Sequence, residues 1–159
     1  MDIVRTVYKV LAYVVAAEVV IQAMAMVYAI AGEGRWIMEG GVMDKAVIES
    51  REFVFPEVLG FAIHGINGTM VIPILALLLL VFSFFAKVPG GVKWAAIVLL
   101  LVVLQATLGI AGHSVPFLGA LHGLNALLLF SAAVYTGLRV RRSAVADNAD
   151  SSARVATPV

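Results

Sequence analysis

The chain repeats one short pattern, Leu-Gly-Phe-Ala-Ile-His-Gly-Ile-Asn-Gly at residues 59–68 and Leu-Gly-Ala-Leu-His-Gly-Leu-Asn-Ala at residues 118–126. Both copies contain His-Gly-(Ile/Leu)-Asn behind a Leu-Gly pair, and a proline precedes each copy, at Pro56 and Pro116. Self-similarity along a chain marks a repeated supersecondary unit. The pattern therefore predicts that one structural unit occurs twice.

A second repeated pattern precedes the first in each half of the chain. Val-Val-Ile-Gln-Ala at residues 19–23 matches Val-Val-Leu-Gln-Ala at residues 102–106, and each leads into Ile-Ala-Gly. Each half thus contains one Gln, then one His, in very apolar sequence. The repeat predicts two helical hairpins, and polar groups are expensive in hydrocarbon, so the retained pair marks a candidate site.

The composition indicates a membrane protein. The 159 residues are 62% hydrophobic, and the mean hydropathy is +1.04. Residues 58–86 and 94–138 carry no formal charge, and residues 10–32 carry only Glu18. The longer uncharged run is broken by Gly-His-Ser-Val-Pro at residues 112–116, which is typical of a tight turn between two spans.

We therefore expect an all-α fold, an integral membrane four-helix bundle of up-down-up-down topology built from two repeated hairpins. The predicted transmembrane domain covers residues 1–142, with helices at residues 5–32, 57–86, 92–112 and 116–139. The predicted outer loop, residues 33–56, holds either a short amphipathic helix at residues 42–52 or no regular structure. Residues 143–159, rich in Ser, Ala and Asp, are expected to form a disordered cytoplasmic tail.

The distribution of Lys and Arg predicts the orientation. These residues flank the first helix, the second connection and the end of the fourth helix: Arg5, Lys9, Lys87, Lys93, Arg139, Arg141 and Arg142. Both termini should then be cytoplasmic in a bacterial inner membrane, with the lipid bilayer as the main partner. The net charge of +1 does not indicate nucleic-acid binding, and zero cysteines exclude disulfides and c-type haem attachment.

The two histidines and the two glutamines fall at similar depths. His64 lies eight residues after Pro56 and His122 six after Pro116, about 12 and 9 Å from the outer surface at the helical rise. The same helical rise places Gln22 and Gln105 about 15 and 10 Å from that surface. The four side chains should share one layer with a pseudo-twofold axis along the membrane normal.

Each histidine shares its helix face with small residues and an asparagine. Gly60, His64, Asn67 and Gly68 lie on one face, as do Gly119, His122, Asn125 and Ala126. Small residues either let helices approach closely or leave room for a flat ligand. Two imidazoles facing each other across the bundle are a standard way to hold haem iron by both axial positions.

Two interpretations of this layer follow. One is a b-type haem with His64 and His122 as iron ligands, and with Gln22, Gln105, Asn67 and Asn125 around it, serving electron transfer or haem handling. The other is a cofactor-free structural or accessory membrane protein whose His, Gln and Asn side chains hydrogen-bond one another. In either case a redox or membrane-complex partner and a homodimer are open possibilities.

Glu18 has no counterpart in the second half, where the equivalent position is Leu101. An ionisable side chain at this depth is a candidate proton or charge site, although it could equally be a protonated structural acid. His113 lies in the predicted outer turn, where it is either a solvent-facing residue or a third metal ligand. Arg35 and Arg51 could pair with haem propionates at the outer surface.

The order Gln-x-x-Leu-Gly, Pro and Leu-His-x-Leu-Asn-Ala-Leu-Leu over residues 105–129 resembles one half of a haem A synthase. That family has two four-helix halves with paired histidines on the second and fourth helix of each. The resemblance implies haem ligation by His64 and His122 near the outer face. A third interpretation is a homodimeric, haem A synthase-like haem-modifying enzyme that rebuilds eight helices from two chains. The chain also resembles small bacterial four-helix membrane proteins of unknown function with a Gln, His and Leu-His-x-x-Asn pattern.

The chain departs from haem A synthase in two respects besides helix number. The family's catalytic carboxylate lies three residues before the histidine of the second helix, where this chain has Phe61. Many members carry a cysteine pair in the first outer loop, and this chain has no cysteine. The residues therefore favour haem binding over chemistry on the haem.

Overall fold

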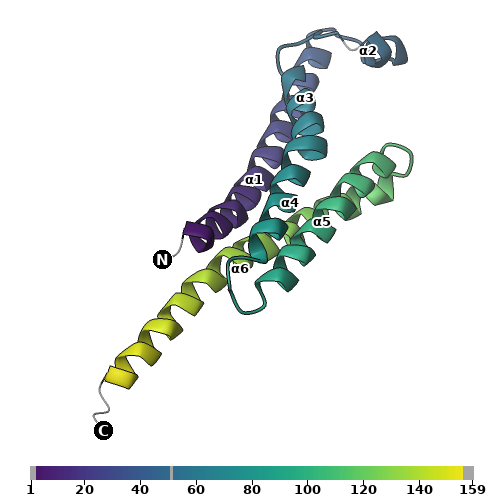
Figure 1. Ribbon diagram of the computed structural model, residues 1–159. Helices are drawn as coiled ribbons and strands as arrows, with labels where there is room; N and C mark the ends of the chain where they lie inside the picture. The colour runs from purple at the N-terminus through teal and green to yellow at the C-terminus, as the bar shows by residue number, and fades with distance from the viewer. Residues whose placement is uncertain (1–2, 51, 156–159) are drawn as a thin grey trace.

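The computed structural model describes residues 3–50 and 52–155, with side chains described as far as Val140. The first hairpin consists of α1 (Ile3–Met38) and an antiparallel helix divided into α3 (Val58–Ile66), η1 (Asn67–Val71) and α4 (Ile72–Ser83). The second consists of α5 (Gly91–Gly112) and α6 (Pro116–Val155). Figure 1 shows these two hairpins side by side, with the short α2 (Lys45–Ser50) beyond the end of α1.

The helices contact one another in the cyclic order α1, α4, α5, α6. Helices that follow each other through short connections are antiparallel neighbours, and α6 returns to pack against α1. The predicted all-α, up-down-up-down bundle of two hairpins is confirmed. The end of the bundle that carries residues 84–90 is called the inner end below, and the end that carries residues 113–115 the outer end, after the predicted orientation.

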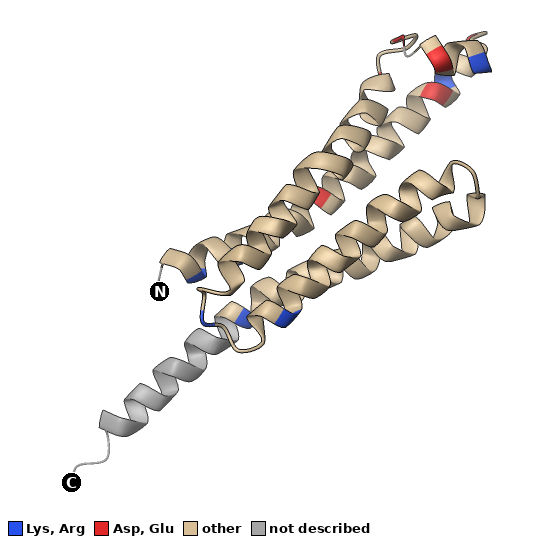
Figure 2. Ribbon diagram, turned by 45° about the vertical axis from the view of Figure 1, so that its right-hand side comes forward, with Lys and Arg blue, Asp and Glu red and all other residues tan. Residues whose placement is uncertain are grey.

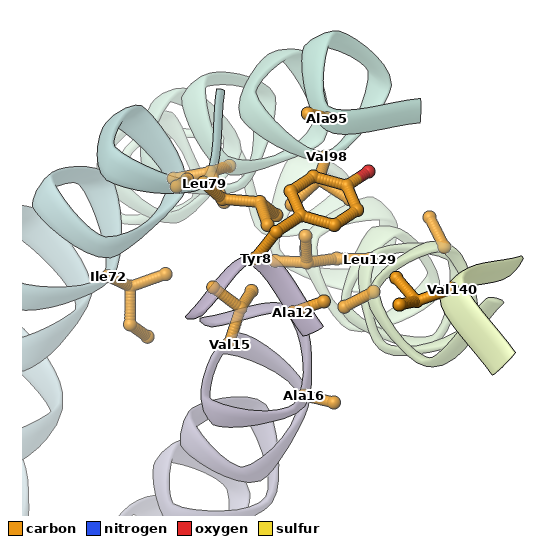
Figure 3. Packing of buried hydrophobic residues seen from close by; sticks show 14 of the residues in the cluster. Tyr8, Ala12, Val15, Ala16, Ile72, Leu79, Ala95, Val98, Leu129 and Val140 are labelled. Carbon is orange, nitrogen blue, oxygen red and sulfur yellow. The ribbon is translucent and has the colours of Figure 1, made fainter. Parts of the chain in front are cut away.

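The buried apolar core lies mainly toward the inner end. It includes Tyr8, Val15, Leu79, Val98 and Leu129, each no more than 2% exposed, so all four long helices contribute to it. Figure 3 shows the Tyr8 ring among Val98, Ala95 and Leu129. The Tyr8 hydroxyl donates a hydrogen bond to the Gly91 carbonyl at 3.0 Å, which satisfies the polar end of a ring whose body is buried.

Two arginines hold the inner connection between α4 and α5. Arg5 Nε donates to the Ala86 carbonyl at 3.0 Å and Arg5 Nη2 to the Lys87 carbonyl at 3.1 Å. From the other side, Arg139 on α6 donates to the Pro89 carbonyl. The connection thus ties the first hairpin to the second at the same end as the core.

The exterior of the bundle is apolar along its length. All four long helices are long and hydrophobic enough to cross a membrane. In the apolar 18-residue stretch of each helix, only 17 to 22% of the residues are buried inside the protein. Lipid-facing surface of this kind is expected only in a membrane protein. Figure 2 shows the charged residues gathered at the two ends of the bundle, and Glu18 is the one charged residue between Lys9 and Glu33.

The outer connection packs back onto the first hairpin. Arg35 Nη2 lies 2.8 Å from Glu57 Oε1, and the rings of Trp36 and Phe55 lie 5.5 Å apart. α1 runs on to Met38, six residues past its predicted end, and the helix predicted at residues 42–52 is the shorter α2. Arg35 thus pairs with Glu57, whereas Arg51 lies outside the described residues.

The predicted disordered tail lies at the limit of the description. α6 runs from Pro116 to Val155, but side chains are described only as far as Val140 and residues 156–159 lie outside the described part of the chain. The tail at residues 143–159 therefore stays a prediction.

The helix that carries His64 has one wide turn that the repeat does not predict. Residues 67–71 form a π-helical turn, in which the Ile72 amide donates to the Asn67 carbonyl, five residues back. Pro73 follows at once and has no N–H to continue the α-helical pattern. On α6 the position equivalent to Pro73 is Ser131, and that helix is continuous. π-helical turns inside helices often lie at functional sites.

Candidate cofactor-binding site

The structure brings the two repeated histidines together. The ring centroids of His64 on α3 and His122 on α6 lie 6.0 Å apart, with an angle of 62° between the ring planes. In the contact order of the helices, α6 and the helix that carries His64 occupy opposite corners of the bundle. The two side chains therefore meet across the bundle at similar depth, as the repeat predicts.

A backbone carbonyl orients each imidazole. His64 Nδ1 lies 3.3 Å from the Gln22 carbonyl oxygen, and His122 Nδ1 lies 2.9 Å from the Gln105 carbonyl oxygen. A carbonyl can only accept, so each Nδ1 carries the proton and each Nε2 carries a lone pair. This tautomer is the one in which Nε2 can bind a metal while Nδ1–H is held by the protein.

The polar side chains of the second hairpin are joined by hydrogen bonds. Asn125 Nδ2 donates to the Leu101 carbonyl at 2.9 Å and to Gln105 Oε1 at 2.6 Å. Gln105 Nε2 lies 3.1 Å from His122 Nε2, which accepts from it in the tautomer derived above. The Asn125 side chain is 3% exposed, so this network lies inside the protein.

The equivalent residues of the first hairpin are arranged differently. Asn67 Nδ2 donates to Glu18 Oε2 at 2.5 Å, not to the glutamine of its own hairpin. Gln22 is 9% exposed, and its Nε2 is buried without a hydrogen-bond partner among the described residues. Its Oε1 lies beside Gly68. A buried polar atom without a partner is costly, and in the second hairpin Asn125 Oδ1 is likewise buried without a partner among the described residues.

His113 does not belong to this layer. It follows α5 in the exposed outer turn. Across the described ranges, no group of three or more His, Cys, Asp or Glu side chains is placed to hold a metal ion. The sequence left open whether His113 is a third ligand, and the structure favours a solvent-facing turn residue.

Small residues lie around both histidines. Gly60 is a packing residue, because a Cβ there would lie 2.3 Å from the Ala25 carbonyl oxygen. A Cβ added at Gly109 of α5 would lie 3.0 Å from the His122 ring. In contrast, a Cβ at Gly65, Gly119 or Gly123 would meet nothing within 4 Å. Small residues thus serve close packing in both hairpins and leave open positions beside both histidines.

An apolar hollow lies on α1 next to Gln22, lined by Ala23, Met24, Val27 and Tyr28. Tyr13 of α1 lies against Gly137 of α6. Met24 and Val27 lie eleven and fourteen residues after Tyr13, which is close to a whole number of helical turns, so they lie on the same face of α1. The Met24 and Val27 side chains are 66 and 67% exposed. α6 therefore covers this face of α1 toward the inner end but not on the outer side of the layer, where Figures 1 and 2 show the hairpins apart.

These features fit a haem. Two metal–nitrogen bonds of about 2 Å, with the rings behind them, separate two imidazole centroids by about 6 Å, and the observed value is 6.0 Å. Both Nε2 atoms have the required protonation in the tautomer derived above. The residues present therefore suit an apolar, flat group held by two axial histidines.

The sequence did not identify the groups that hold the imidazoles. The atoms that hold Nδ1 of each ring are the backbone carbonyls of Gln22 and Gln105, and of the two glutamine side chains the structure places that of Gln105 against a histidine ring. Side-chain identity gives no signal for a carbonyl. Pro73 inside an apolar run was the available signal for the π-helical turn.

The fold and the layer together define a small four-helix, multi-pass membrane protein with a pair of facing histidines within its bundle. No protein-family model, curated protein or solved structure matches the chain.

Proposed function

We propose that this chain binds one b-type haem between His64 and His122 and serves electron transfer or haem handling in a bacterial inner membrane. The observation that carries the proposal is the 6.0 Å spacing of the two ring centroids, together with Nδ1 contacts that place the lone pair of each ring on Nε2. The resemblance of residues 105–129 to half of a haem A synthase agrees with it.

The bound haem would supply a reversible one-electron couple. His64 and His122 would hold the iron, while the Gln22 and Gln105 carbonyls fix the imidazoles and raise their basicity through Nδ1. The apolar walls of the layer would keep water from the site, and two histidine ligands would leave no coordination position open for a substrate. This arrangement suits electron transfer better than chemistry on a bound substrate, and the position of the resembled family's carboxylate is Phe61.

A cofactor-free structural role is the second candidate. The network of Asn125, Gln105 and His122 favours it, because these side chains hydrogen-bond one another without a ligand. Neither hairpin is fully satisfied, because Gln22 Nε2 and Asn125 Oδ1 are both buried without a partner in the described part of the chain.

The ratio of haem to protein separates these functions. Protein expressed with ample haem supply and purified in detergent should contain about one non-covalent b haem per chain, measured as the pyridine complex after extraction. One haem per two chains would indicate a site between the subunits of a homodimer, as a haem A synthase-like dimer would need. A colourless protein would leave the cofactor-free role.

We also propose that both termini are cytoplasmic, since Lys and Arg flank the inner end. The chain has no cysteine, so Met38→Cys and Phe85→Cys each introduce a single thiol at positions 90 and 63% exposed. A membrane-impermeant thiol reagent should label Met38→Cys in intact spheroplasts and label Phe85→Cys only after lysis. Labelling of Phe85→Cys alone in intact spheroplasts would reverse the orientation.

A further inference from the structure

The two halves of the layer differ at one repeat position. Glu18 lies four residues before Gln22, and Leu101 lies four residues before Gln105. In the second hairpin the asparagine amide reaches the Leu101 backbone carbonyl and the Gln105 side chain. In the first hairpin the Glu18 carboxylate extends from this position and receives the Asn67 amide instead.

This exchange of partner changes what the glutamine does. Asn125 holds Gln105 Oε1 at 2.6 Å, and the other end of that amide then lies 3.1 Å from His122 Nε2. Gln22 receives no such bond from Asn67, and its Nε2 has no partner among the described side chains. The one hydrogen bond of the His64 ring within the described chain is the Nδ1 contact with the Gln22 carbonyl.

We propose that Glu18 is a positioning residue that makes the two histidines unequal as metal ligands. His64 offers a free Nε2 lone pair, whereas the Nε2 lone pair of His122 accepts a hydrogen bond from the Gln105 side-chain amide. A metal that binds His122 must first displace an amide hydrogen bond, which lowers the binding constant about five- to tenfold relative to a free lone pair. If the proposed haem is bound, on which this part of the inference rests, His64 is the anchoring ligand and His122 is the exchangeable one. A small neutral donor such as imidazole or carbon monoxide would therefore enter on the His122 side.

The first test uses the protein without haem, so it does not depend on haem binding. Nitrogen-15 NMR of histidine-labelled protein in detergent should show both rings protonated at Nδ1, with a hydrogen-bonded Nε2 only for His122. Glu18→Leu gives the first hairpin the leucine that the second hairpin has at this position. In this variant Asn67 should donate to Gln22 instead. The nitrogen-15 chemical shift of His64 Nε2 should then move to the value of His122 Nε2. Glu18→Gln retains an oxygen for Asn67 and should keep the wild-type pattern.

This test also separates Glu18 from the π-helical turn as the cause of the asymmetry, because the turn is unchanged in Glu18→Leu. Equal Nε2 shifts for the two wild-type histidines would overturn the proposal. So would a Glu18→Leu protein that retains the wild-type difference, or a Glu18→Gln protein that loses it. A general packing defect would not distinguish leucine from glutamine in this pattern.

The second test loads the variants with haem. His122→Ala should retain haem as a five-coordinate complex that binds added imidazole, while His64→Ala should hold at least about fivefold less haem. Equal retention, or better retention by His64→Ala, would contradict the assignment. If the wild-type chain takes up no haem, the proposed function fails, and the NMR comparison still decides whether Glu18 makes the histidines unequal.

Discussion

Alanine at either His64 or His122 should abolish the six-coordinate, low-spin haem spectrum. In the proposed haem site each substitution would remove one iron ligand, and the nearest remaining imidazole, with its ring centroid 6.0 Å away, would already be the ligand on the opposite side. A single histidine leaves the iron five-coordinate and high-spin. We therefore expect the narrow α band of the reduced protein to disappear completely in both variants, as measured by visible absorption after purification at equal protein concentration.

His113→Ala is the matched control, because His113 is the third histidine of the chain and lies in the exposed outer turn. Its spectrum and haem content should equal those of the wild type. Loss of the low-spin spectrum in His113→Ala, or an unchanged spectrum in His64→Ala, would show that the ligand pair is wrongly assigned.

Gly60→Ala should lower the stability of the first hairpin strongly. An added Cβ would lie 2.3 Å from the Ala25 carbonyl oxygen and 3.0 Å from the Ala29 Cβ. Backbone atoms cannot rotate out of the way, so α1 and α3 must separate. Overpacking of this kind costs about 1–3 kcal/mol, and contact with backbone places this site at the upper end. Thermal unfolding in one fixed detergent should show a clear fall in the midpoint.

Gly34→Ala provides the comparison. Gly34 is also a helical glycine of the first hairpin, but a Cβ there would meet nothing within 4 Å. Alanine is a better helix former than glycine by about 1 kcal/mol, so the midpoint should be unchanged or slightly raised. Equal midpoints for the two variants would mean that α1 and α3 do not pack through Gly60.

The repeat and the uncharged runs were sufficient to predict the bundle. Hydrocarbon requires each spanning segment to satisfy its own backbone hydrogen bonds, so long apolar segments in a chain of this kind form helices. The shared position of His64 and His122 after their prolines then predicts that they meet, and their rings are in contact. These features depend on local sequence and on repeat symmetry, which can be read directly.

The details of the site depend on contacts between helices, which the sequence does not specify. The repeat suggests that Asn67 and Asn125 are equivalent, yet Asn67 binds Glu18 whereas Asn125 binds Gln105. Glu18 was recognised as the position that breaks the symmetry, but its partner was not. A Cβ at Gly60 would meet α1, whereas at Gly119 it is the backbone that lies close to Gly112 of α5, although both glycines fit the same pattern.

The position of the layer relative to the core bears on its role. The buried apolar core, which includes Val98 and Leu129, lies toward the inner end, where Arg5 and Arg139 also hold the inner connection. Figure 1 shows the two hairpins apart at their outer ends. A rigid inner half and a more open outer half would allow a flat group to enter between the hairpins without unfolding the bundle.

The visible spectrum of the wild-type protein, purified in detergent from cells supplied with haem and then reduced with dithionite, tests the haem site most directly. Ligation by both His64 and His122 predicts narrow α and Soret bands of low-spin, six-coordinate b haem at about one haem per chain. A protein that is folded and colourless would contradict the haem site, and so would a high-spin spectrum without a narrow α band.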